Sequence, residues 1–195
     1  MIEKILSSQD INFIGSWFID DLTICDDLIT YFNTYPEKQA QGYTSKGIES
    51  KIKKSTDMAV FENTDAPEVI NYLAALKKIS YQYIKKFPAA AATANWGIKE
   101  RINIQYYKPE EGYYEYHSER MSAARLINAR HLVFMTYLNT VTDGGETEFC
   151  HQKLKVSAEK GLTLIWPVDW TYLHRGIPSP SQDKYIITGW FSFYE

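Results

Sequence analysis

The spacing of hydrophobic residues along the chain changes near residue 96. Before that point, two segments carry apolar side chains at helical spacing. The first follows a cap at Asp20 or Asp21 and ends before Pro36, and the second is capped by Asp65 and ends before Pro88. We therefore expect two amphipathic helices in the first half of the chain, each with its apolar stripe against a sheet.

After residue 96, short segments show the spacing of β-strands. Apolar and polar residues alternate over residues 102–107 and 132–138, residues 162–166 are continuously apolar, and residues 185–193 form the last such segment. A further short strand is expected within residues 10–19, with a turn at Gly15-Ser16. This order predicts a mainly β fold with flanking helices (α+β), in the form of a barrel or sandwich backed by two N-terminal helices.

The polar segment of residues 37–63 has two interpretations. One is a solvated loop with a single strand at residues 58–61, because runs of charge are usually solvated. The other is a flap that closes over a substrate, because loops longer than about 12 residues in compact domains are often functional lids. The segment contains a cluster of lysines at Lys46, Lys51, Lys53 and Lys54.

Composition excludes several classes of protein. A chain of 195 residues that is 45% hydrophobic can bury a sizeable core. Two cysteines, Cys25 and Cys150, are too few for a disulfide scaffold or a zinc cluster, so we expect a reducing, cytoplasmic setting. The absence of a signal-like start and of a long apolar run predicts no membrane partner. A net charge of −3 makes nucleic acid an unexpected partner.

The strongest chemical signal is the sequence His117-Ser118-Glu119. Residues two apart in an extended chain share one face, so this imidazole and carboxylate can bind the same metal ion. His174 lies between two strand-like runs and can supply a third ligand. Two histidines and one carboxylate on one face of a metal ion leave the opposite positions open, as in non-heme iron(II) oxygenases.

Lys184 follows His174 on a segment whose other residues are those of a buried strand. A buried lysine without a counter-ion is costly, so this position indicates a pocket for an anion. The alternative is an edge-strand lysine that prevents aggregation.

These residues occur in an order that resembles the iron(II) and 2-oxoglutarate dependent dioxygenases, in particular their prolyl 4-hydroxylase-like branch. The matching residues cover the C-terminal half of the chain. They comprise Tyr106-Tyr107-Lys108-Pro109, Gly112, Tyr114, His117-x-Glu119, the strand from Arg130 to Asn139, Gly144-Gly145-Glu146-Thr147-x-Phe149, Lys160-Gly161, Leu173-His174-Arg175-Gly176, Lys184 and Trp190.

The resemblance implies a double-stranded β-helix, or jelly roll, as a single dioxygenase domain over residues 1–195. Residues 1–99 would supply helical support and the substrate loop, and residues 100–195 the catalytic β-core. It also implies Fe(II), 2-oxoglutarate and O2 as cofactor and cosubstrates, with ascorbate as an optional addition.

The resemblance assigns roles to seven residues. Iron would be held by His117, Glu119 and His174, which are also the catalytic set. The far carboxylate of 2-oxoglutarate would bind Lys184, with help from the Tyr107 hydroxyl and Thr147, and Trp190 would form a wall of the cosubstrate pocket.

The chain departs from the family pattern in two places. Glu119 stands where the family usually has Asp, and the extra methylene moves the carboxylate by roughly 1.5 Å. One extra residue before His117 leaves open whether Tyr106 or Tyr107 contacts the cosubstrate, and we favour Tyr107.

Other polar residues near these motifs have weaker claims to a role. His131 and His151 match no family position, and His151 is expected at the surface. Arg130 and Arg175 are candidate substrate contacts, whereas Arg125 is expected to be ordinary surface charge. Two further charges flank a turn and are expected to be solvated, namely Glu146 and Glu148.

The function expected from the resemblance is hydroxylation of an unactivated C–H bond, with conversion of 2-oxoglutarate to succinate and CO2. A prolyl residue in a peptide or protein is the expected substrate. The alternatives are the same chemistry on a small metabolite, a free amino acid or a nucleobase, and a jelly-roll binding module without catalytic turnover, which only the Glu119 departure supports.

Overall fold

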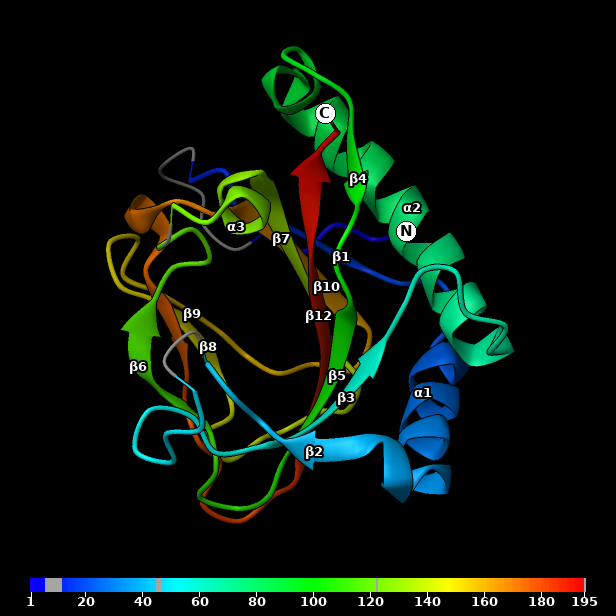
Figure 1. Cartoon of the computed structure of the whole chain (residues 1–195), viewed down its shortest axis with the longest axis vertical. Coiled ribbons are helices and arrows are strands. Elements are labelled where there is room, and N and C mark those ends of the chain that lie inside the picture. The colour runs from blue at the N-terminus through cyan, green and yellow to red at the C-terminus, as the bar shows by residue number, and fades with distance from the viewer. Residues whose placement is uncertain (6–11, 45–46, 122, 195) are drawn as a thin grey trace.

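The computed structural model describes residues 1–5, 12–44, 47–121 and 123–194, which form two facing β-sheets with helices on one outer side (Figure 1). The first half of the chain contains β1 (Gly15–Phe18), α1 (Thr23–Thr34), η1 (Pro36–Lys38), β2 (Gln39–Gln41), β3 (Thr56–Val60), α2 (Pro67–Lys86), η2 (Pro88–Ala91) and β4 (Trp96–Ile98). The second half contains β5 (Ile102–Tyr107), β6 (Tyr113–His117), α3 (Arg125–Asn128), β7 (Arg130–Tyr137), β8 (Thr147–Phe149), β9 (Leu154–Val156), β10 (Leu162–Pro167), η3 (Trp170–Tyr172), β11 (His174–Gly176) and β12 (Lys184–Phe193).

The larger sheet has eight strands, and the long strand β12 lies at its centre. The order is β1-β10-β7-β12-β5-β3-β2, and β4 pairs with the end of β12. All pairings of β12, with β7, β5 and β4, are antiparallel. Strands from the first half of the chain therefore complete a sheet whose centre comes from the second half.

The smaller sheet has four strands in the order β6-β11-β8-β9 and faces one side of the larger sheet (Figure 1). Helices α1 and α2 cover the opposite side of the larger sheet. This arrangement confirms the expected fold class, a mainly β jelly roll backed by two N-terminal helices. The space between the two sheets is where inward side chains of both can meet.

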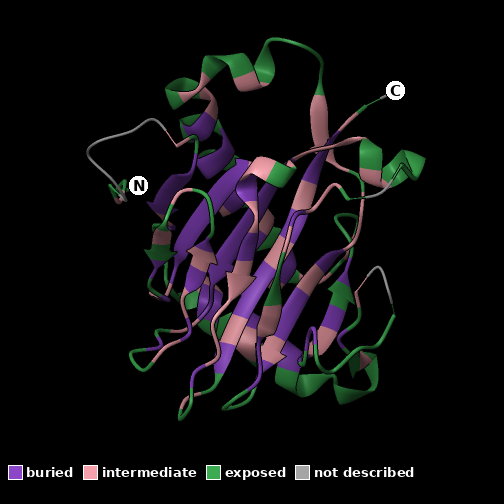
Figure 2. Cartoon of the chain, turned by 90° about the vertical axis from the view of Figure 1, so that its left-hand side faces the viewer, coloured by how far each residue is buried: buried purple, intermediate pink, exposed green. Residues whose placement is uncertain are grey.

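Alternation along the strands divides the core into two clusters. Ile102 and Ile104 of β5 pack with the helices, whereas Tyr107 belongs to the cluster between the sheets. In β7, Phe134 packs toward the helices and Met135 toward the smaller sheet. The central strands β5, β7, β10 and β12 are buried along much of their length, whereas β2, β4 and β6 contain no buried residue (Figure 2). Each central strand thus has one face for packing and one for the inter-sheet space.

The predicted cap of α1 at Asp20 or Asp21 does not form, because the N-cap residue is Leu22, which makes no side-chain cap. Asp21 Oδ1 instead accepts hydrogen bonds from the N–H and the hydroxyl of Thr23, the first residue of the helix. The predicted cap at Asp65 is wrong. The first residue of α2 is Pro67, which has no N–H to satisfy, and no side chain caps this helix. Thr64 Oγ1 instead accepts a hydrogen bond from the N–H of Ala66 at 3.2 Å.

The predicted turn at Gly15-Ser16 is also wrong, because both residues lie in β1 and pair with β10. A Cβ at Gly15 would lie 2.4 Å from the Trp17 ring, so glycine is needed here for close packing. Residues 10 and 11 of the expected strand lie outside the described residues.

The segment of residues 37–63 is more ordered than a solvated loop with a single strand. It contains η1 and two paired strands, β2 and β3, and the expected strand near residue 58 begins at Thr56. Lys53 is 3% exposed, and its Nζ pairs with Asp57 Oδ2 at 2.6 Å. Lys46 lies outside the described residues. Among the described helices, none is long and apolar enough to cross a membrane.

Candidate active site

His117, Glu119 and His174 meet in the space between the two sheets. His117 ends β6 and is the direct cross-strand partner of His174 at the start of β11. Glu119 Oε1 lies 3.3 Å from His117 Nε2 and 3.4 Å from His174 Nε2. One ligand atom from each residue lies within 4.8 Å of the other two, which fits a single metal ion.

The surroundings of the two imidazoles orient them for a metal. His117 Nδ1 lies 3.2 Å from the carbonyl oxygen of Glu115, and His174 Nδ1 lies 2.9 Å from that of Tyr172. An N–H at each Nδ1 donates to these carbonyls and leaves the Nε2 lone pairs free. Burial and the neighbouring His174 lower the pKa of His117, which keeps it neutral. Two lone pairs and a carboxylate oxygen thus converge on a point that a cation would stabilise.

The carboxylate of Glu119 is held from its other side. Trp190 Nε1 donates a hydrogen bond to Glu119 Oε2 at 3.0 Å, and Arg130 Nη1 donates one to the Glu119 carbonyl at 2.9 Å. The Arg130 guanidinium also stacks on Trp190, 3.6 Å from the ring centroid. These contacts fix the longer Glu side chain, so its extra methylene does not prevent the carboxylate from reaching both imidazoles.

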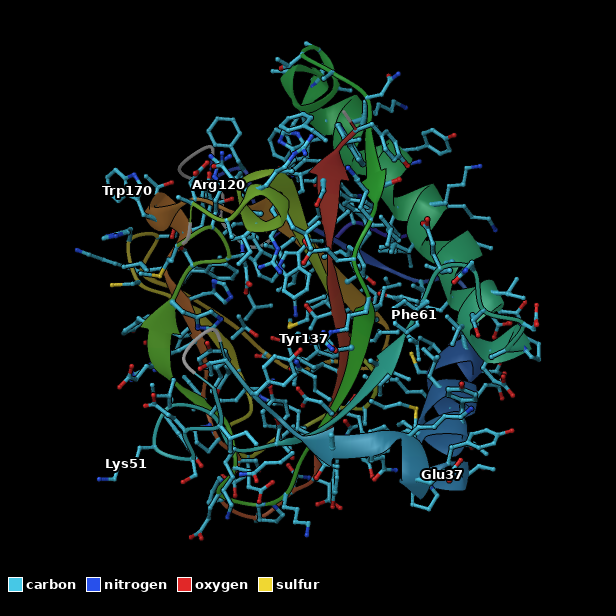
Figure 3. The ribbon with its side chains drawn as sticks, in the orientation of Figure 1. Glu37, Lys51, Phe61, Arg120, Tyr137 and Trp170 are labelled. Atoms are coloured by element: carbon cyan, nitrogen blue, oxygen red, sulfur yellow. The ribbon has the colours of Figure 1, made fainter. Side chains whose placement is uncertain are left out.

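A cavity of about 390 Å³ opens beside this cluster. Tyr137, which lies between the two sheets, is one of its walls (Figure 3). The seven candidate site residues all line this one cavity: His117, Glu119, His174, Lys184, Tyr107, Thr147 and Trp190. The structure therefore brings together all seven residues to which the resemblance assigns a role.

Lys184 is 4% exposed, and the hydrogen-bond acceptors of its ammonium group among the described residues are neutral carbonyls. Its Nζ donates to the carbonyl oxygens of Gly145 at 3.2 Å and Ile177 at 3.4 Å. Within the described parts of the chain, no carboxylate lies within 4.0 Å of this nitrogen. Burial lowers the pKa of Lys184 to about 8. An anion in the cavity would supply the missing counter-charge.

The structure separates the two candidate tyrosines. Tyr107 is 3% exposed and lines the cavity, with its ring centroid 5.0 Å from Lys184 Nζ. Tyr106 lies on the other face of β5, where its ring stacks on Tyr185 and its hydroxyl donates to Asp183. The Tyr107 hydroxyl donates to Gln105 Oε1 at 2.7 Å, so its proton is already committed in this structure.

Comparison with known proteins agrees with this geometry. The family model of the 2OG-Fe(II) oxygenase superfamily matches residues 102–192. The match runs from the start of β5 to near the end of β12. Together with the geometry of the site, it identifies the chain as a 2-oxoglutarate-dependent dioxygenase, whose cofactor and cosubstrates are Fe(II), 2-oxoglutarate and O2. A search of curated protein sequences finds no significant match.

Solved structures of prolyl hydroxylases share the fold of this oxygenase. The viral collagen prolyl hydroxylase from Paramecium Bursaria Chlorella virus-1 is 21% identical, with a TM-score of 0.68 over 93% of this chain and 97% of that one. A prolyl-4-hydroxylase from Pseudomonas putida is 14% identical, with a TM-score of 0.70 over 94% of both chains. The prolyl hydroxylase from Trichoplax adhaerens is 16% identical, with a TM-score of 0.74 over 93% of this chain and 84% of that one.

Sequence reasoning missed a polar network on one wall of the oxygenase cavity. Lys53 Nζ lies 2.6 Å from Asp57 Oδ2, Ser55 Oγ donates to Asp57 Oδ1 at 2.7 Å, and Gln105 Nε2 donates to Asp57 Oδ2 at 3.5 Å. Gln105 in turn accepts the hydroxyl proton of Tyr107. Gln105 could have been identified from the sequence, because it lies two residues before Tyr107 on β5 and therefore faces the same side of the strand. No pattern in the sequence marks Lys53.

The remaining charged candidates divide between the cavity and the surface. Arg130 lines the cavity and pairs with Glu100, its Nε donating at 2.8 Å. The expectation that Glu148 is solvated is wrong, because Arg175 Nε donates to it at 2.7 Å across the β8–β11 pair. Arg125 is exposed, as expected.

The two competing histidines stay away from the metal cluster. His131 Nε2 lies 2.8 Å from the carbonyl oxygen of Ala90, and its ring packs 4.4 Å from that of Phe193. His151 is exposed, as expected, and contacts Trp170 edge-on at 6.3 Å between ring centroids. Neither residue lines the cavity.

Proposed function

We propose that this oxygenase hydroxylates a prolyl residue within a peptide or protein. The observation that carries the proposal is one cavity holding two histidines and a carboxylate together with a buried, uncompensated lysine. The likeness in fold to several prolyl hydroxylases supports proline as the target. One of them, from Trichoplax adhaerens, was solved in complex with a hypoxia inducible factor oxygen degradation domain peptide fragment.

In this proposal His117, Glu119 and His174 would hold Fe(II) through two Nε2 atoms and a carboxylate oxygen. Bound iron, 2-oxoglutarate and O2 together supply the oxidation of a C–H bond, with release of succinate and CO2. The chain holds the ligands in place, since each Nδ1 faces a carbonyl oxygen and Trp190 donates to Glu119. Glu119 serves in the position where the family usually has Asp.

Lys184 would bind the far carboxylate of 2-oxoglutarate. In the described parts of the chain its ammonium donates to two carbonyls and pairs with no carboxylate, so an incoming carboxylate replaces no existing ion pair there. Thr147 and Tyr107 line the same cavity. For Tyr107 to donate to the cosubstrate, its hydroxyl must first leave Gln105.

A peptide is favoured over a small metabolite by the exposed apolar side chains that line the cavity. Tyr43, Met121 and Leu126 are 48%, 69% and 50% exposed, and each also lines the cavity. A small substrate held beside the iron would leave these side chains in water, whereas a chain extending out of the cavity would cover them.

The first test is succinate formation by purified protein supplied with Fe(II), 2-oxoglutarate, ascorbate and O2. We expect His174→Ala and Lys184→Ala each to lower the rate at least about 100-fold, because one removes a metal ligand and the other the anion partner. His151→Ala is the matched control and should keep wild-type activity, since His151 lies outside the cavity. Full activity in either site variant would contradict the assigned roles.

The second readout concerns the substrate. Proline-containing peptides are incubated with the complete enzyme, and mass spectrometry detects a gain of one oxygen atom on proline. Hydroxyproline that forms with wild type and not with His174→Ala supports the proposal. If succinate forms readily with free amino acids or other small molecules and no peptide is hydroxylated, the prolyl assignment is wrong while the oxygenase chemistry stands.

A further inference from the structure

The cavity of this acidic protein is lined by an excess of positive charge. Five basic side chains and three acidic ones line it, although the whole chain carries a net charge of −3. The basic residues are Lys53, Arg101, Arg130, Arg175 and Lys184, and the acidic ones are Asp57, Glu100 and Glu119. The local charge is therefore opposite in sign to that of the molecule as a whole.

Two of the basic side chains are neutralised by acids of the same cavity. Lys53 pairs with Asp57 at 2.6 Å, and Arg130 pairs with Glu100 at 2.5 Å. A third, Arg175, pairs at 2.7 Å with Glu148, which lies outside the cavity lining. These three cations have partners within the protein and need none from a ligand.

Two of the five basic side chains, Lys184 and Arg101, have no carboxylate partner among the described residues. Lys184 lies deep in the cavity at 4% exposure and is the partner we propose for 2-oxoglutarate. Arg101 is partly exposed and, within residues 1–5, 12–44, 47–121 and 123–194, has no carboxylate within 4.0 Å. The far carboxylate of 2-oxoglutarate is assigned to Lys184, so Arg101 is available to a different carboxylate.

Arg101 is also held in place by an aromatic ring. Its guanidinium carbon lies 4.8 Å from the ring centroid of Tyr43, a residue of the segment between β2 and β3. A cation that stacks on a ring loses less side-chain freedom when it binds a ligand, and its planar N–H groups stay available for a bidentate contact. An ordinary surface arginine would have neither this stacking partner nor a place in the cavity wall.

We propose that Arg101 binds a carboxylate of the substrate, so that the enzyme prefers proline flanked by an acidic residue. The inference rests on the proposed prolyl hydroxylation and adds the charge of the substrate to it. Tyr43, Met121 and Leu126 would cover the apolar neighbours of that residue. A glutamate or aspartate side chain close to the target proline is the chemistry that Arg101 recognises.

The test uses pairs of proline-containing peptides that differ only by Glu or Gln at one position within three residues of the proline. Their Kd is measured by fluorescence anisotropy on enzyme loaded with Fe(II) and 2-oxoglutarate under argon, and their KM in air. At one position or more, wild type should bind the Glu peptide about tenfold more tightly, the size of a hydrogen bond to a charged group. The ratio should fall toward one in Arg101→Gln and as salt is raised.

Arg120→Gln is the control for loss of a positive charge, because Arg120 pairs with Asp169 and does not line the cavity. It should keep the wild-type ratio, and neither variant should change the KM for 2-oxoglutarate. Equal Kd values for every Glu and Gln pair, a ratio that persists in Arg101→Gln, or no peptide binding at all would overturn the inference. A Glu preference without hydroxyproline would instead overturn the prolyl assignment and leave the role of Arg101 intact.

Discussion

Lys184 shows how one residue can prepare a cavity for an anion. Its amine is buried, its two hydrogen-bond acceptors are neutral carbonyls, and burial lowers its pKa to about 8 from an ordinary value of 10.5. Below that pKa the ammonium is present and attracts a carboxylate. As the pH rises through about 8, the free enzyme loses this charge, so cosubstrate binding must weaken on the alkaline side.

We therefore expect the KM for 2-oxoglutarate to be constant below about pH 7 and to rise above pH 8, approaching tenfold for each further pH unit. Initial rates of succinate formation between pH 6.5 and 9.5 measure this. Lys184→Arg keeps its charge throughout the range, so its KM should show no such rise. A flat wild-type profile would mean that Lys184 is not the cosubstrate's partner.

Sequence patterns predicted the site residues that are marked by their spacing along a strand. They missed the cations whose place in the cavity wall depends on the tertiary fold. His117 and Glu119 share a face because they are two residues apart in extended chain, and Lys184 lies on a strand whose pattern predicts that it is buried. Nothing local to Lys53 or Arg101 distinguishes them from other surface cations. Lys53 pairs with Asp57, which is four residues later and lies on β3, and Arg101 lines the cavity beside Tyr43, 58 positions earlier in the chain.

The turn between β7 and β8 supplies a backbone carbonyl that binds Lys184 of β12. Gly144 and Gly145 have φ of +74° and +80°, a region that favours glycine. A Cβ on Gly145 would lie 2.7 Å from Val141 Cγ1, and the Gly145 carbonyl accepts a hydrogen bond from Lys184. The conformation of this turn therefore sets the position of an acceptor for Lys184.

Gly145→Ala should lower the free energy of unfolding by about 1–3 kcal/mol and raise the KM for 2-oxoglutarate, because strain and contact with Val141 both displace the carbonyl. Urea denaturation and succinate kinetics measure the two effects. Gly47→Ala is the matched control. Gly47 has φ of +98° and open space around its Cβ position, so the variant carries only the backbone cost. Equal KM changes in both variants would contradict the explanation.

At the level of elements, alternating hydrophobicity predicted the central strands well and the helix caps and turns less well. β5, β7, β10 and β12 lie where the pattern placed them, because each has one or both faces buried. The errors at Gly15 and Asp65 have local causes. Glycine can serve close packing as well as a turn, and a proline at the first helical position reduces the need for a cap.

The whole molecule separates the packing of its helices from its chemistry. Leu76 of α2 is 1% exposed and belongs to the cluster between the helices and the larger sheet, which lies on the far side of the sheet from the cavity. Leu76→Ala should lower the free energy of unfolding by about 2–5 kcal/mol, the cost of a large-to-small change in a core. Chemical denaturation measures the loss.

The KM for 2-oxoglutarate should stay within about twofold of wild type in the same variant at a temperature where it is folded, since its cavity is unaltered. Met135→Ala is the counterpart on the other face of the sheet, because Met135 is buried and lines the cavity. It should change both stability and KM. A KM shift of equal size in Leu76→Ala would show that the sheet transmits disturbance from one face to the other.

Along strand β12, residues that pack against the helices alternate with residues that line the cavity. Ile187 packs against the helices, whereas its neighbour Thr188 lines the cavity. A substitution at a cavity position such as Thr188, which holds neither the metal nor the cosubstrate, can change substrate preference, while positions such as Ile187 preserve the ability to fold. A lineage that inherits such a strand can diversify its chemistry one codon at a time without first rebuilding its architecture.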